Sequence, residues 1–98
     1  MSELPVVAVI TAKDGSADLV RDALKALVPP TRAEEGCLSY ALYESASTPG
    51  VFVTVESWRD KSDLDAHMAS DHIAQTFAVA GDGLAGAPVI HALTPVDV

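Results

Sequence analysis

Apolar and polar residues recur along this chain with two different periods, and these periods predict where its strands and helices lie. Residues 6–12 are a short β-branched run that is apolar on both faces, which is typical of a central strand. Residues 19–28 instead place apolar side chains at helical spacing and predict one core-facing stripe. That stripe comprises Leu19, Val20, Ala23, Leu24, Leu27 and Val28. Ser16 can cap this helix at its start, and Pro29-Pro30 should end or kink it.

The remainder of the chain predicts three more strands. Residues 37–44 and 51–58 alternate in the manner of strands, and the turn-forming residues 47–50 join them directly. Residues 88–94 have the composition of a last strand.

A second helical segment lies between the third strand and the last. Asp60 can cap a helix that carries Leu64 and His67, and Ser70 or Asp71 can cap its continuation. The resulting order is β-α-β-β-α-β, the ferredoxin-like split βαβ arrangement of an α+β fold with an antiparallel sheet. A chain of 98 residues accommodates this fold as one domain, residues 1–98.

The two faces of the third strand differ sharply in character. Val51, Val53 and Val55 share one face, whereas the even-numbered residues 52–58 share the other. Two helices cover one side of such a sheet. The face with Val51, Val53 and Val55, here called the valine face, is then an exposed apolar patch that another protein surface would have to cover. We therefore expect a homodimer, and with it a dimeric α+β barrel.

Charge and composition exclude several classes of partner. The chain has 14 acidic and 6 basic residues, a net charge of −8, which repels nucleic acid and anionic lipid. It has no apolar run long enough to cross a membrane, and its first residues lack the basic and apolar pattern of a signal peptide. We therefore expect a cytoplasmic protein. Cys37 is the single cysteine, which excludes an intramolecular disulfide and a cysteine metal cluster.

The mixed face of the third strand carries the first candidates for chemistry. Burying an unpaired carboxylate costs several kcal/mol, so Glu56 must lie at an edge, have a partner or line a cavity. It is either a satisfied structural carboxylate or an acid/base group with a raised pKa. Trp58 either packs in the core or dimer interface, or stacks on a planar substrate, with Phe52 as a second aromatic wall.

Histidines on the second helical segment are the candidate bases. An unperturbed imidazole has a pKa of about 6.5, which makes histidine the usual general base at neutral pH. His67 falls near the Leu64 face that packs on the sheet, and is either a hydrogen-bonded core residue or a catalytic base. His72 lies five residues on, about 140° round a helix, so a shared metal is not expected unless the helix breaks at Ser70. His91 in the last strand is expected to be structural.

Four segments in this order resemble the antibiotic biosynthesis monooxygenase family, in its quinol monooxygenase-like branch. They are Thr31-Arg-Ala-Glu-Glu-Gly-Cys37, Tyr40-Ala-Leu-Tyr43, Phe52-Val-Thr-Val-Glu-Ser-Trp58 and His67-Met-Ala-Ser-Asp-His72. The resemblance implies a small homodimeric α+β barrel. Tyr40 and Tyr43 lie on opposite strand faces, and the resemblance favours Tyr40 as the one that contacts substrate.

The resemblance also implies a range of reactions. Several family members oxidise electron-rich aromatics with O₂ without metal or flavin, and others degrade haem or isomerise small phosphorylated ketones. Haem-degrading members use an Asn on the first strand, and this chain has no Asn. The cofactor-free aromatic oxygenases of polyketide pathways place an Asn where this chain has Thr54.

The leading hypothesis is therefore a cofactor-independent monooxygenase acting on a quinol, phenol or similar aromatic, with O₂ as co-substrate. His67, Glu56 or His72 would supply the base, and Trp58 and Phe52 the aromatic wall. We expect no flavin, haem or metal cofactor. The alternatives are an isomerase of a small ketone, phosphorylated or not, and a non-catalytic dimeric module that binds a small molecule.

Overall fold

Four antiparallel strands form one sheet in a computed structural model that describes residues 3–98. The strands are β1 (Leu4–Thr11), β2 (Cys37–Glu44), β3 (Val51–Trp58) and β4 (Val89–Ala92), in the order β2-β3-β1-β4. The predicted bounds of the second and third strands are confirmed to the residue. The first two residues of the predicted domain lie outside the described residues.

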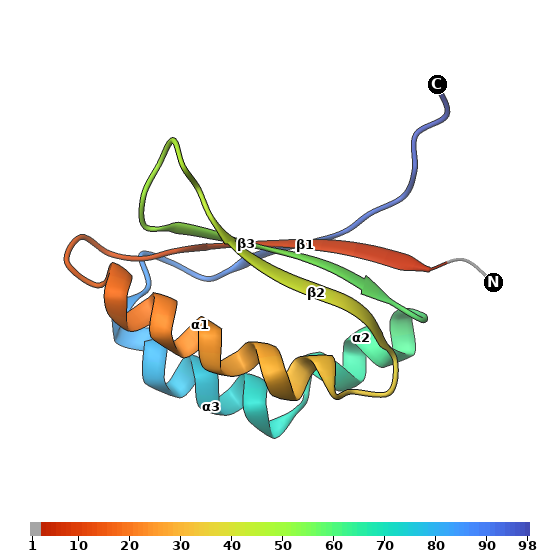
Figure 1. Ribbon diagram of the computed structural model, residues 1–98, viewed down its shortest axis with the longest axis horizontal. Helices are drawn as coiled ribbons and strands as arrows, with labels where there is room; N and C mark the ends of the chain where they lie inside the picture. The colour runs from red at the N-terminus through yellow and green to blue at the C-terminus, as the bar shows by residue number, and fades with distance from the viewer. Residues whose placement is uncertain (1–2) are drawn as a thin grey trace.

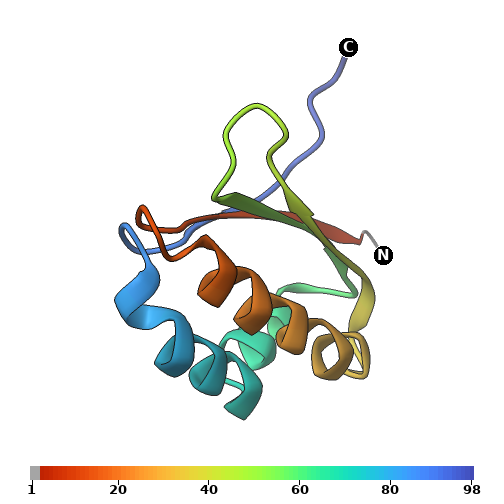
Figure 2. The ribbon, with the colours of Figure 1, turned by 60° about the vertical axis from the view of Figure 1, so that its left-hand side comes forward.

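All the helices lie on the same side of this sheet. They are α1 (Ala17–Arg32), α2 (Lys61–Met68) and α3 (Asp71–Ala80), and a short 3₁₀ turn, η1 (Gly81–Gly83), follows α3. Figure 1 and Figure 2 show α1 and α3 running beside each other beneath the strands, with the opposite side of the sheet free of helices. The predicted α+β, ferredoxin-like fold is therefore confirmed.

The core lies between the sheet and α1. Alternate β1 side chains, Val6, Ala8 and Ile10, point into it. Most of the predicted α1 stripe packs against them, namely Val20, Ala23, Leu24 and Leu27, while Val28 is half-buried. Leu19 is the exception at 44% exposure. It lies at the margin of the stripe, where α1 faces α3 rather than the sheet.

Helix α1 does not end at its two prolines. The helix continues through Pro29-Pro30 to Arg32, and the Ala33 N–H donates to the carbonyl of Pro29 at 3.2 Å. Proline removes a donor but keeps its acceptor. The carbonyls left without a helical donor belong to Lys25 and Ala26, which are exposed, so water can satisfy them. Of the two predicted effects of Pro29-Pro30, an end of the helix at the prolines is therefore wrong, and a kink there stays a prediction.

The second helical segment is two helices rather than one. Asp60 caps α2, as predicted, by accepting from the N–H of Asp63. Ser70 caps α3 by accepting from the N–H of Ile73 at 3.3 Å, and its hydroxyl donates to the carbonyl of His67 at 2.6 Å. The chain therefore turns at Ser70, and His72 lies in the first turn of a new helix.

A bulge in β2 changes which of its residues face inward. Cys37 pairs with Trp58 and Ser39 pairs with Ser57, so Leu38 is the extra residue. Leu38 is therefore 49% exposed, although alternation alone predicts that it shares a face with Tyr40. Tyr40 lies opposite Glu56 and is buried. A bulge shifts the alternation by one residue, which explains the difference.

The valine face of β3 is the side of the sheet without helices. Val51 and Val53 are half-buried and Val55 is 46% exposed, whereas Phe52, Thr54, Glu56 and Trp58 are buried on the other side. The predicted division of the two faces is confirmed. Within residues 3–98, the helices are all too short or too polar to cross a membrane.

Candidate functional site

A small cavity lies between the inward face of the sheet and the helices. Its polar lining comes from Tyr40 of β2, Thr54 and Glu56 of β3 and His67 of α2. The apolar lining is Ala8, Ile10, Leu24, Leu27, Met68, Ile73, Phe77, Pro88 and Ile90. The cavity volume is about 30 Å³, close to the share of one water molecule in the liquid. An aromatic ring therefore enters only when lining side chains move, and Met68, 42% exposed, is the flexible one.

Glu56 is a buried carboxylate satisfied from its own strand. Its Oε2 accepts from the hydroxyl of Thr54 at 2.6 Å and its Oε1 accepts from the indole N–H of Trp58 at 2.8 Å. Residues two apart on a strand point to the same face, which brings these donors to either side of Glu56. Both carboxylate oxygens thus accept hydrogen bonds from neutral donors, and Glu56 links the side chains of Thr54 and Trp58 on this face of the sheet.

His67 is held between an aromatic layer and a carboxylate. Its ring centroid lies 4.7 Å from that of Trp58 and 5.9 Å from that of Tyr40. Its Nδ1 lies 2.6 Å from Oε2 of Glu34, and its side chain is 3% exposed. A carboxylate oxygen only accepts, so Nδ1 carries the proton in this contact. In the neutral tautomer with its proton on Nδ1, Nε2 is the ring nitrogen without a proton, and His67 is one of the residues that line the cavity.

His72 contacts the same oxygen of Glu34. The distance from His72 Nε2 to Glu34 Oε2 is 2.8 Å, and the side chains of His72 and Glu34 are 25% and 17% exposed. One carboxylate therefore joins the loop after α1 to both α2 and α3. Among residues 3–98, neither a lysine nor an arginine forms an ion pair with Glu34.

Glycine at position 36 lets the loop that carries Glu34 lie against α2. A Cβ at Gly36 would collide with the side chain of Asp63, in the first turn of α2. The carbonyl of Gly36 accepts from the N–H of Arg59 at 2.8 Å, and the N–H of Glu34 donates to the carbonyl of Thr31 at 3.0 Å. These contacts bring Glu34 within reach of the two histidines.

Tyr40 is a hydrogen-bonding group rather than a base in this cavity. Burial, with the nearby Glu56 carboxylate as a smaller cause, raises the pKa of Tyr40 far above its ordinary value. Its phenol therefore stays protonated at neutral pH. Of the two tyrosines, Tyr40 faces inward and Tyr43 is 58% exposed on the other side of the sheet.

The predicted site residues are only partly brought together. His67, Glu56 and Tyr40 line the cavity, whereas Trp58 is fully buried behind His67 and is absent from the cavity wall. Phe52 packs in the core, with the guanidinium of Arg21 5.5 Å from its ring centroid. The predicted role of Trp58 and Phe52 as an aromatic wall therefore does not match this cavity.

Two further residues, His91 and Glu34, differ in how well the sequence predicts their place in the structure. His91 is exposed on β4 and is not among the residues that line the cavity. Glu34 itself was not predicted, because two adjacent glutamates, Glu34 and Glu35, occupy the loop and no spacing rule selects one. Its presence in the family-like segment that ends at Cys37 is the only signal in the sequence.

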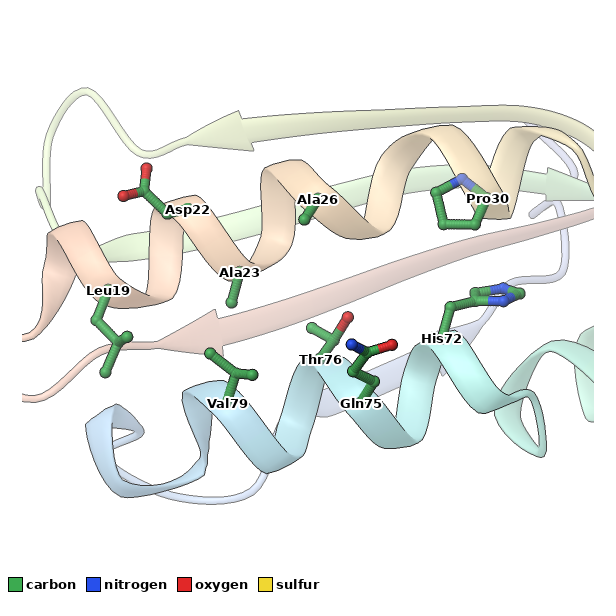
Figure 3. Close-up of a pocket in the computed structure, with 9 residues that line it drawn as sticks. All are labelled: Leu19, Asp22, Ala23, Ala26, Pro30, His72, Gln75, Thr76 and Val79. Atoms are coloured by element: carbon green, nitrogen blue, oxygen red, sulfur yellow. The ribbon is translucent and has the colours of Figure 1, made fainter.

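A second hollow lies on the outer side of the helix layer, between α1 and α3. Its volume is about 470 Å³ and it is lined mainly by short or apolar side chains, together with Asp22, His72 and Gln75. Figure 3 shows His72 at one end of this groove, on the α3 side and below Pro30 of α1. His72 thus lies on the outer groove rather than on the cavity that contains His67.

Comparison with known proteins identifies a family model and relatives that match most of the chain. Residues 4–79 match the family model described as antibiotic biosynthesis monooxygenase. The Mycobacterium tuberculosis protein named "Putative monooxygenase Rv0793" is 36% identical over 96 residues, which cover 98% of this chain and 94% of that protein. The Bacillus subtilis protein named "Putative monooxygenase YcnE" is 35% identical over 65 residues, 66% of this chain and 67% of that protein.

Solved structures agree with these matches. The structure of Rv0793 superposes with a TM-score of 0.87 and covers 99% of this chain and 98% of that one. The structure of PA3566 from Pseudomonas aeruginosa has a TM-score of 0.90 at 32% identity and covers 99% of this chain and 97% of that one.

Proposed function

This chain belongs to the antibiotic biosynthesis monooxygenase family, and from that premise we propose that it oxidises a quinol, phenol or similar electron-rich aromatic with O₂ and without a cofactor. The single observation that supports this most directly is the placement of His67. Its Nδ1 is engaged by Glu34 and its ring lines the cavity, so Nε2 is left as a base within the protein interior.

The proposed chemistry begins with a proton transfer. Nε2 of His67 takes the proton of a phenolic hydroxyl, and Glu34 stabilises the imidazolium that forms because it already accepts from Nδ1. The deprotonated aromatic is electron-rich enough to reduce O₂ itself. A quinol and one O₂ then give a hydroxyquinone and one water, a balanced monooxygenation that needs no external reductant.

The other lining groups fit this role. Tyr40 lines the same cavity and its raised pKa keeps its proton in place, so it would donate a hydrogen bond to the substrate anion. Glu56 is already occupied by Thr54 and Trp58, so we assign the base to His67 rather than to Glu56. The apolar remainder of the lining keeps water away from the reactive anion.

The isomerase alternative uses the same base but a different substrate. A phosphorylated ketone requires a lysine or arginine beside its phosphate, and the residues that line this cavity include neither. The lining therefore favours an uncharged aromatic over a phosphorylated ketone, and a binding module without catalysis is the remaining alternative.

The decisive experiment measures O₂ uptake with a panel of hydroquinones, and ¹⁸O₂ incorporation into the product. We expect one labelled oxygen atom in the product, and a rate that falls by about 10²–10⁴-fold in His67→Ala, the usual scale for positioned acid/base catalysis. His91→Ala is the matched control because His91 is exposed on β4, and it should retain the wild-type rate.

Three results would count against the proposal. Quinol oxidation without ¹⁸O in the organic product would indicate simple autoxidation. Absence of turnover with every quinol would favour the isomerase or the binding module. A His67→Ala variant that melts earlier but turns over normally would show that His67 is a structural residue.

A further inference from the structure

We propose that Glu34, His67 and His72 form a binding site for one divalent transition-metal ion of the Zn²⁺ type. Two imidazole nitrogens and a carboxylate oxygen are a common three-residue ligand set for zinc, with water in the fourth position. Among residues 3–98, these three side chains place one ligand atom each within 4.8 Å of one another. They come from three separate segments, the loop after α1, α2 and α3.

The distances are close to those that a bound ion requires. Zinc binds histidine nitrogen and carboxylate oxygen at about 2.0–2.2 Å, so tetrahedral ligand atoms lie about 3.3 Å apart. The observed separations from Glu34 Oε2 are 2.6 Å to His67 Nδ1 and 2.8 Å to His72 Nε2. The three ligand atoms all lie within 4.8 Å of one another, so side-chain shifts on the order of 1 Å would bring them to the separations of a bound ion.

A metal ion can take the place of the protons that Glu34, His67 and His72 share. Glu34 Oε2 accepts from two imidazole N–H groups, so two protons lie where an ion would sit. On metal binding, each proton would move to the other nitrogen of its ring, which keeps both imidazoles neutral. The ion would leave the cluster with a net charge of about +1 in a chain whose formal charge is −8. Partial exposure of Glu34 and His72 gives the ion access from solvent.

The break between α2 and α3 makes the site possible. On one continuous helix, His67 and His72 would point about 140° apart. The turn at Ser70 separates the two helices, and Ser70 fixes it by bonding both to His67 and to Ile73. His67 and His72 can therefore reach one ion together with Glu34, although they are five residues apart in the sequence.

One consequence rests on the proposed function. A metal on Nδ1 of His67 leaves the proton of the neutral ring on Nε2, so Nε2 can no longer accept a proton from substrate. Zn²⁺ should therefore inhibit the oxidation rather than support it, and a chelator should restore the rate.

Metal binding itself is measured without substrate. Purified, chelator-treated protein is titrated with Zn²⁺ by calorimetry and with Co²⁺ by visible absorbance. We expect one ion per chain, Co²⁺ absorption bands typical of nitrogen and oxygen ligands, and a higher melting temperature with Zn²⁺. His72→Ala and Glu34→Gln should each weaken Zn²⁺ binding by at least about 100-fold, and His91→Ala should leave it unchanged.

The outcomes separate this inference from the proposed function. Equal Zn²⁺ affinity in wild type and His72→Ala, or no binding by wild type, would overturn the metal site even in a protein that oxidises quinols. Loss of Zn²⁺ affinity in His91→Ala would show that the ion binds at β4, and this result would also overturn the proposed site. One-to-one binding that depends on His72 and Glu34 supports the site, whether or not any quinol is oxidised.

Discussion

At the scale of single residues, the buried carboxylate of Glu56 shows how a polar group is kept in an apolar interior. It is 6% exposed and accepts from one hydroxyl and one indole N–H. Each donor replaces water that the carboxylate lost on folding, and a buried acceptor without a donor costs about 1–3 kcal/mol or more when it is charged. Trp58 therefore has two roles, since it also packs against the ring of His67.

Trp58→Phe tests these roles separately. The variant keeps an aromatic ring behind His67 but removes the N–H that donates to Glu56 at 2.8 Å. We expect the free energy of unfolding to fall by about 1.5–3 kcal/mol, and turnover per folded molecule to fall much less than in His67→Ala. Chemical denaturation and O₂ uptake measure the two effects. Tyr43→Phe, on the exposed side of the sheet, should change stability by less than about 0.5 kcal/mol.

A Trp58→Phe variant with unchanged stability would show that the Glu56 carboxylate does not depend on the indole donor. A rate loss as large as that of His67→Ala, at normal stability, would assign Trp58 a direct part in the chemistry.

At the scale of elements, the turn between α2 and α3 determines the geometry of the histidines. Helix α2 ends at Met68 and α3 begins at Asp71, with Ser70 as the capping residue between them. Its hydroxyl accepts from the N–H of Ile73 at the start of α3 and donates to the carbonyl of His67 at the end of α2. Ser16 occupies the equivalent position before α1, yet its side chain makes no capping hydrogen bond.

This contrast gives a matched pair of variants. Ser70→Ala should lower the free energy of unfolding by about 1 kcal/mol, the typical cost of removing a serine N-cap. Ser16→Ala should have a much smaller effect because there is no side-chain bond to lose. Thermal or urea unfolding of the two variants measures the difference. Equal destabilisation would contradict the assigned cap at Ser70.

At the scale of the whole molecule, one side of the sheet lacks cover. The helices all lie on the other side (Figure 1). Val55 is 46% exposed on this side, and Val89 of β4, which pairs with Val9, is 52% exposed. The last residues of the chain run away from the helices (Figure 1), and Val96 among them is 82% exposed. A second copy of the chain would cover this apolar surface.

We therefore predict a homodimer, twice the chain mass of 10.2 kDa, in light scattering on a sizing column. Val55→Glu places a charge on the uncovered side of the sheet and should shift the protein toward monomer. Val79→Glu is the matched control, because Val79 is similarly exposed but lies on the α1–α3 groove. A wild-type monomer that is stable at micromolar concentration would contradict the prediction, as would a Val55→Glu variant that dimerises normally.

Local pattern by itself determined most of the architecture. The alternation in residues 37–44 and 51–58 set the bounds of β2 and β3, and the two faces of β3 followed from the period of a strand. The α1 stripe also followed from its period, apart from Leu19 at its margin. These features depend on residues a few positions apart, so the sequence carries them directly.

The tertiary structure decided which of the candidate groups meet. Glu34 lies 33 residues before His67 and 38 before His72, and its contact with them depends on the approach of Gly36 to α2 and on the turn at Ser70. The bulge at Leu38 likewise depends on how β2 pairs with β3. Long-range approaches of this kind leave no period in the sequence. Packing and pairing alone therefore select Glu34 over Glu35, bring His67 and His72 to one carboxylate, and leave Trp58 and Phe52 out of the cavity lining.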